Sequence, residues 1–130
     1  MKRFALLMAA AVIAGWFAAP AQAFPPFKAA FTERYVDKSN NEGFKAAAKE
    51  ASCNVCHVKD EKKSVQNEYG HALHEELEKS GEKPKELMKS DKEKLLKLLD
   101  EAFTAVEKEK SKGGKTFGEL IKSGMLPAGN

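Results

Sequence analysis

The sequence predicts an all-α protein, and three observations support this fold class. Apolar side chains recur every three or four residues in several stretches after residue 24. Residues that commonly cap helices stand just ahead of these stretches. Gly, Asn and Ser-Gly separate the stretches, and no run of β-branched residues indicates a strand. The 130 residues are enough for one domain.

The first 23 residues predict a signal peptide. Lys2 and Arg3 form a basic start, an apolar run covers residues 4–19, and Ala21-Gln22-Ala23 forms a cleavage site. We therefore expect export to the periplasm or secretion, with the mature domain at 24–130. The apolar run is short for a membrane span, which needs about 20 residues. We expect no stable membrane span after cleavage, and a retained anchor is the alternative.

The predicted mature domain is almost neutral. Two of the 22 basic residues lie in the signal peptide, so 20 basic and 19 acidic residues remain, a net charge of +1. Binding to a nucleic-acid backbone needs a concentrated positive field. The charge balance therefore argues against a nucleic-acid partner, and the lysine-rich faces are expected to be solvated surface or a docking patch for an acidic redox partner.

Two helices are expected before the cysteine pair. The first carries three aromatic residues on one face, because Phe27, Phe31 and Tyr35 recur every four residues. Asn40 or Asn41 can cap the second helix, which is rich in alanine and leads into the cysteines. A charged turn follows over residues 59–63.

Four further helical segments are expected in the second half of the chain. Two pairs match the capping-box pattern, Ser90 with Glu93 and Thr116 with Glu119. The first of them opens the longest helix, which extends to about Val106. The four segments are Ser64–Ser80 ended by Gly81, Pro84–Met88, the long helix from Ser90, and a short helix from Thr116 to Gly124.

The only two cysteines lie in Cys53-Asn54-Val55-Cys56-His57. This C-x-x-C-H spacing is the attachment signature of c-type haem. Two thiols one helical turn apart can add to the two vinyl groups on one porphyrin edge. The histidine that follows then lies beneath the iron and can bind it through a ring nitrogen. The motif predicts one covalently attached haem c, held by Cys53 and Cys56, with His57 as an iron ligand.

Three other interpretations of the cysteine pair remain open. A disulfide suits an oxidising compartment but gives His57 no role. A thiol–disulfide exchange motif has the same spacing, but it usually opens a helix after a strand, and no strand is predicted here. A zinc site needs a fourth ligand and thiols that stay reduced after export.

These residues resemble the small mono-haem cytochromes c. The resemblance rests on Cys53, Cys56 and His57, on the alanine-rich helix before them, and on an all-α domain of similar length. It implies a bundle of about four to five short helices around one haem, with His57 as the proximal ligand. In two places the chain departs from the family. Lys49 stands where an aromatic residue is common, and no methionine lies in the loop before the last helix.

The sixth iron ligand has four candidates: Met125, His74, Met88 and His71. On the third helix, His74 lies beyond the edge of the apolar arc and His71 lies nearly opposite its centre, so both are also expected as surface residues. Met125 lies in a loop that can present its thioether to iron, or it plugs the core near the C-terminus. Met88 is also interpreted as a core residue. The remaining alternative is an iron that is open on this side.

Tyr69 has two interpretations as well. Its ring can pack on the haem with the hydroxyl near a propionate, or it can be an ordinary core tyrosine whose hydroxyl has a hydrogen-bond partner. The phenylalanines are expected in the core, some of them against the porphyrin edge: Phe27, Phe31, Phe103 and Phe117.

The sequence favours an electron carrier over an enzyme. The haem iron would cycle between ferric and ferrous states and exchange single electrons with redox partner proteins, and we expect a monomer. No cluster of acid, base or nucleophile is visible elsewhere. The alternatives are a haem enzyme or gas-binding protein with an open axial position, and a haem-free exported protein with a structural disulfide.

Overall fold

The computed structural model describes residues 25–129, and over these residues the all-α prediction is confirmed. Six α-helices are present where the family resemblance implied four to five. Their bounds are α1 (Pro25–Phe31), α2 (Glu42–Ala51), α3 (Glu68–Lys79), α4 (Pro84–Ser90), α5 (Lys92–Val106) and α6 (Phe117–Lys122). A π-helical turn, η1 (Thr32–Val36), extends α1, and a 3-10 turn, η2 (Ser52–Val55), extends α2. The predicted signal peptide lies outside the described residues.

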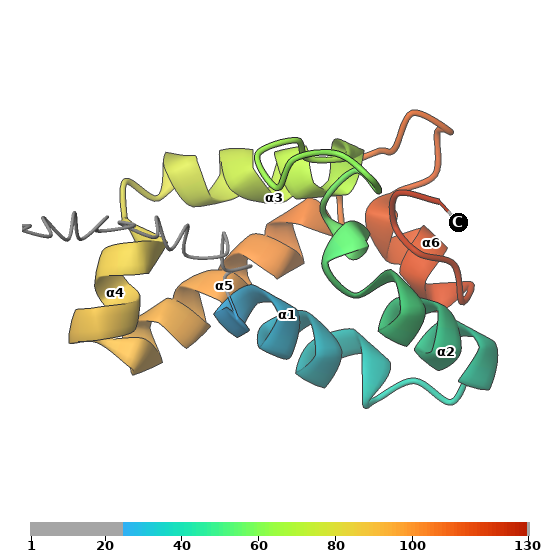
Figure 1. Ribbon diagram of the computed structural model, residues 1–130, viewed down its shortest axis with the longest axis horizontal. Coiled ribbons are helices and arrows are strands. Elements are labelled where there is room, and N and C mark those ends of the chain that lie inside the picture. The colour runs from blue at the N-terminus through green and yellow to red at the C-terminus, as the bar shows by residue number, and fades with distance from the viewer. Residues whose placement is uncertain (1–24, 130) are drawn as a thin grey trace, which may run out of the picture.

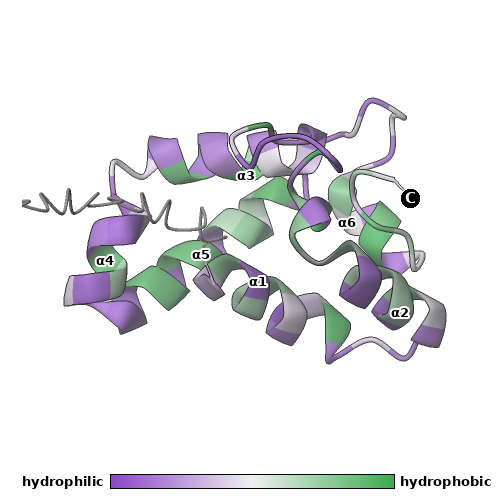
Figure 2. Ribbon diagram, in the orientation of Figure 1, coloured by the Kyte–Doolittle hydropathy of each residue, from purple (hydrophilic) through white to green (hydrophobic). Residues whose placement is uncertain are grey.

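α5 is the central helix of the fold. It contacts α1, α3 and α4, and Figure 1 shows it crossing the middle of the molecule, with α4 at one end and α2 and α6 at the other. In Figure 2, α5 carries hydrophobic residues and runs between α3 on one side and α1 on the other. Its buried positions recur every three or four residues, and they are Leu95, Leu98, Leu99, Ala102, Phe103 and Val106.

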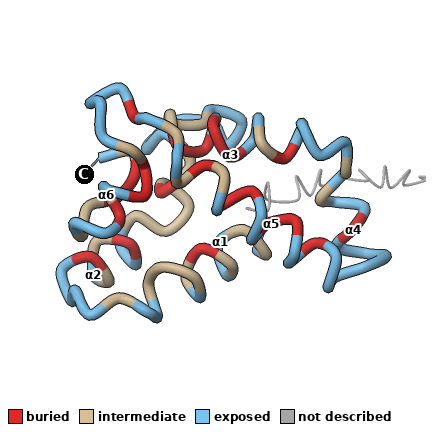
Figure 3. The backbone as a smooth tube through the Cα atoms, turned by 180° about the vertical axis from the view of Figure 1, so that it is seen from behind, coloured by how far each residue is buried: buried red, intermediate tan, exposed pale blue. Residues whose placement is uncertain are grey.

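The core continues from α5 into the neighbouring helices. Figure 3 shows buried positions on the inward sides of α1, α2, α3 and α6, with exposed backbone outside them. Aromatic rings join these helices: Phe31 packs against Tyr35, Tyr69 and Phe103, and Tyr69 packs edge-on against Phe117 at 5.3 Å between centroids. The predicted core positions of Phe31, Phe103 and Phe117 are thus correct.

Side-chain caps begin four of the helices. Asn41 caps α2, as expected from the sequence, and its Oδ1 accepts a hydrogen bond from the Phe44 amide at 3.0 Å. The predicted capping box of Thr116 and Glu119 is present at the start of α6. Asn67 caps α3 and Asp91 caps α5.

Two predicted boundaries are wrong. The third helix was expected from Ser64 but begins at Glu68, because the chain before it folds back and pairs Val58 with Val65 through a backbone hydrogen bond of 3.1 Å. The predicted capping box at Ser90 is replaced by Asp91, whose carboxylate accepts from the Lys94 amide. Ser90 instead ends α4 and donates to the carbonyl of Glu86.

No α-helix between residues 25 and 129 is long and apolar enough to cross a membrane.

Candidate functional site

A cavity of about 900 Å³ opens between α1, α2, η2, α3 and α4. Its volume lies in the range of sites that hold a cofactor or a small molecule. Apolar side chains form much of its wall, and they are Phe27, Phe31, Val36, Ala48, Val55, Leu73, Leu77 and Phe103. Covering apolar surface of this kind with an apolar ligand is favourable in water.

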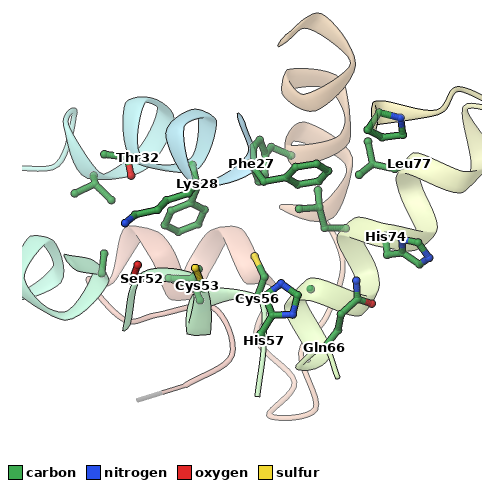
Figure 4. Close-up of a pocket in the computed structure, with 18 of the residues that line it drawn as sticks. Phe27, Lys28, Thr32, Ser52, Cys53, Cys56, His57, Gln66, His74 and Leu77 are labelled. Atoms are coloured by element: carbon green, nitrogen blue, oxygen red, sulfur yellow. The ribbon is translucent and has the colours of Figure 1, made fainter. Parts of the chain in front are cut away.

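Cys53, Cys56 and His57 all line this cavity. In Figure 4 their side chains rise from the same stretch of chain, and Phe27 and Lys28 of α1 lie across the cavity from them. Both cysteines are free thiols. The structure therefore brings the three residues of the C-x-x-C-H motif together on one wall.

The turn from α2 into η2 aims the cysteine pair at the cavity. Ser52, at the end of α2, has φ of +50°, a left-handed conformation that is costly for a residue other than glycine. The reversal lets the chain continue at once as a 3-10 turn. The amides of Cys56 and His57 both donate to the carbonyl of Cys53, at 3.3 and 3.1 Å, so the motif is one compact turn.

The start of α3 locks this turn in place. The side-chain amide of Asn67 donates to the carbonyls of Asn54 and Val55 at 3.1 and 2.9 Å, while its Oδ1 accepts from the Gly70 amide. The backbone of α3 lies so close to the motif that a Cβ on residue 70 would overlap the carbonyl of Cys56. The sequence did not reveal the roles of Asn67 and Gly70. The only signal for them was that both lie beside Tyr69, in Asn67-Glu68-Tyr69-Gly70.

Burial sets the protonation of the inner thiol. It raises the pKa of Cys56 to about 12, with a smaller contribution from the neighbouring Cys53. Without a bound group, Cys56 is therefore a protonated thiol at neutral pH. The Nδ1 of His57 is buried and has no hydrogen-bond partner among the described residues.

The four candidates for the sixth ligand lie in different places. Only His74 lines the cavity. His71 faces a second, smaller hollow on the other side of α3. Neither methionine is among the lining residues: Met88 is exposed on α4, and Met125 lies half-buried after α6. Met88 is thus not the core residue that the sequence indicated.

Tyr69 occupies the core behind the cavity and does not line it. Its ring lies between Phe31 and Phe117, and its hydroxyl is buried without a hydrogen-bond partner among the described residues. Burial, with a smaller contribution from the nearby Tyr35, raises the pKa of Tyr69 well above its ordinary value. The burial of the ring matches the core interpretation of Tyr69, whereas the hydroxyl lacks the hydrogen-bond partner which that interpretation expects.

Direct binding of a metal ion by side chains would need a cluster of ligands among residues 25–129. Within that part of the chain, no three His, Cys, Asp or Glu side chains gather into a group that could hold a metal ion. Comparison of the chain with protein-family models, with curated protein sequences and with solved structures gave no match.

Proposed function

We propose that this protein is a mono-haem c-type cytochrome that transfers single electrons between redox partners. One observation carries the proposal: both free thiols and the imidazole of the C-x-x-C-H motif lie on one wall of a cofactor-sized, largely apolar cavity. A structural disulfide would need no such cavity, and it would leave His57 without a role. A haem would use all three side chains and fill the space beside them.

The residues of the site would have different roles in binding the haem. Cys53 and Cys56 would form the two thioether bonds, and His57 would bind the iron. The apolar wall would keep water from the porphyrin. Lysines among the lining residues could balance the two haem carboxylates, and they are Lys28, Lys45, Lys49, Lys83 and Lys85. When bound, the haem supplies a metal centre that accepts and releases one electron.

The proposal extends to the fold and the location of the protein. The helices would form a cytochrome c-like bundle around the haem. Residues 1–23 would direct export, and the mature protein would work as a monomer in the periplasm or outside the cell. It would meet its redox partners by transient contact at the cavity mouth.

The test is to export the protein from a host with haem-attachment machinery and to record its absorption spectrum before and after reduction with dithionite. We expect a sharp α-band in the reduced protein. The chromophore should survive acid–acetone extraction, and the intact mass should exceed that of the polypeptide by one haem. Reversible titration with redox mediators should follow a one-electron curve.

Matched variants separate attachment from ligation. Cys53→Ala with Cys56→Ala should abolish covalent attachment, and His57→Ala should change the iron coordination. His71→Ala removes a histidine outside the cavity and should leave the spectrum of the wild type unchanged. A wild-type protein that is exported under these conditions without a visible chromophore would refute the proposal and favour the disulfide.

A further inference from the structure

Among the described residues, the wall across the cavity from His57 carries neither a histidine nor a methionine, and Lys28 supplies an amine there. Figure 4 shows Phe27 and Lys28 of α1 on that side, and Phe31 and Thr32 of the same segment also line the cavity. Two of these four side chains are hydrocarbon rings, which cannot coordinate a metal. Methionine, the usual partner of histidine in electron-carrying cytochromes c, is absent from the lining within the described residues.

His74 lies at the side of the cavity and is turned outward. In Figure 4 its ring points away from His57 and Cys56. Its Nε2 lies 3.3 Å from the carboxylate of Glu78, one turn further along α3, and its side chain is 54 % exposed. His71 makes the corresponding contact with Glu75 and is 66 % exposed. His74 thus has the environment of an ordinary surface histidine.

The segment that forms the opposite wall is held firmly in place. Phe31 is buried at the end of α1. In η1, Arg34 donates to Glu107 at 3.0 and 3.2 Å and to Thr104 at 2.9 Å, and it also pairs with Asp100. The hydroxyl of Tyr35 donates to the same Glu107 carboxylate at 2.7 Å. These contacts fix α1 against α5, so an exchange of α1 for a ligating segment would require them to break.

We propose that no side chain of residues 25–129 would bind the haem iron opposite His57, and that a small neutral diatomic molecule would bind there with Phe27 and Phe31 as its apolar cover. This inference rests on the covalent haem proposed above. The rings of Phe27 and Phe31 carry no charge and no hydrogen-bond donor, which suits a neutral ligand such as carbon monoxide or nitric oxide, and Lys28 and Thr32 are the polar side chains of the same wall. The protein would then sense or bind such a gas as well as carry electrons.

The test uses the intact holoprotein with carbon monoxide as the probe. Covalent attachment is first established by acid–acetone extraction and mass, so failure of the haem proposal is recognised separately. We expect a high-spin ferric spectrum, and a ferrous protein whose Soret band shifts on addition of carbon monoxide with a saturable isotherm. A haem protein that stays low-spin in both states and does not bind carbon monoxide would overturn the inference.

Variants identify any protein ligand and test the cover. His74→Ala, with His71→Ala as its matched control, should leave the spin state unchanged, and so should Lys28→Ala, Met88→Leu and Met125→Leu. Conversion from low spin to high spin in any of them would overturn the inference and name the ligand. Phe27→Ala should speed carbon monoxide association several-fold, with the helical circular dichroism retained. An unchanged association rate would overturn the role of α1 as the cover.

Discussion

The close approach of α3 to the cysteine motif depends on the absence of a side chain at Gly70. The Cys56 carbonyl occupies the place of a Cβ on this residue. The same carbonyl also accepts a hydrogen bond of 3.0 Å from the backbone amide of Asn67. Any side chain at position 70 therefore pushes the first turn of α3 away from the residues that face the cavity.

Replacing Gly70 by alanine should lower the free energy of unfolding by about 3 kcal/mol, because backbone and not a flexible side chain must move to admit the methyl group. Urea unfolding followed by circular dichroism measures the change. Gly113→Ala is the control, since a Cβ there would lie 3.6 Å from the Ser111 hydroxyl, an ordinary contact. Equal effects of the two substitutions would contradict the packing argument.

The residues of the motif could be identified from the sequence, whereas the residues that position them could not. Cys53, Cys56 and His57 carry their chemistry in their spacing. The contacts of Asn67 and Gly70 with the motif depend on how the chain between residues 58 and 66 folds back, and no local pattern encodes that path. The same holds for the positive φ of Ser52, a residue type that rarely signals a left-handed turn.

At the scale of elements, Asn67 both begins α3 and ties it to η2. Its replacement by alanine removes the helix cap and two hydrogen bonds to the carbonyls of Asn54 and Val55. We expect a loss of about 2 kcal/mol in unfolding free energy. Asn41→Ala removes a cap alone and should cost about 1 kcal/mol. Thermal or urea unfolding measures the stability of both variants. An equal loss of unfolding free energy would mean that the hydrogen bonds from Asn67 to η2 do not stabilise the fold.

The capping box of α6 gives the fold a measurable response to acid. The backbone amide and the hydroxyl of Thr116 donate to the Glu119 carboxylate and lower its pKa below the ordinary value of 4.5. The lowered pKa stabilises the fold above the unfolded-state value, and this contribution is lost as the pH falls through the folded-state value. Glu119→Gln should therefore flatten the decline of stability with acid.

Unfolding midpoints of the two proteins, measured from neutral pH to below pH 4.5, test this expectation. Glu61→Gln removes the same charge from the exposed loop before α3 and is the control. An acid dependence of Glu119→Gln that follows the wild type would mean that the box does not contribute.

Helix boundaries were predictable where a local signal decides them. The Thr116 and Glu119 box, the Asn41 cap and the start of α4 at Pro84 all depend on neighbouring residues, and the structure has them where the sequence indicated. The start of α3 depends instead on tertiary pairing of Val58 with Val65. The aromatic spacing of Phe27, Phe31 and Tyr35 indicated one helix, yet the chain widens into a π-helical turn that lets Tyr35 reach Glu107.

At the scale of the whole molecule, the fold surrounds a cavity that its own side chains leave open. The side chains that line the cavity have fewer packing contacts on the side that faces it than side chains inside the core. The helices on either side of the cavity, α1 and α3, both pack on α5. A rigid apolar group bound between α1 and α3 would be in contact with both helices.

Loss of the proposed haem should consequently weaken the whole domain. We expect exported Cys53→Ala, Cys56→Ala protein to unfold at a lower temperature and a lower urea concentration than the holoprotein, with a broader transition. Calorimetry and circular dichroism measure both, and Lys59→Ala with Lys62→Ala serves as a double substitution outside the cavity. Equal stability with and without attached haem would contradict a structural role for the group.

The lock between Asn67 and the cysteine turn joins residues only 12 and 13 positions apart. Closing so short a loop costs little chain entropy, so this corner can form while distant segments are still disordered. The opposite wall cannot form as early, because it depends on a contact between Arg34 and Glu107, which are 73 residues apart in the sequence. A nascent chain would thus present its two thiols on a preformed turn before the cavity around them has closed.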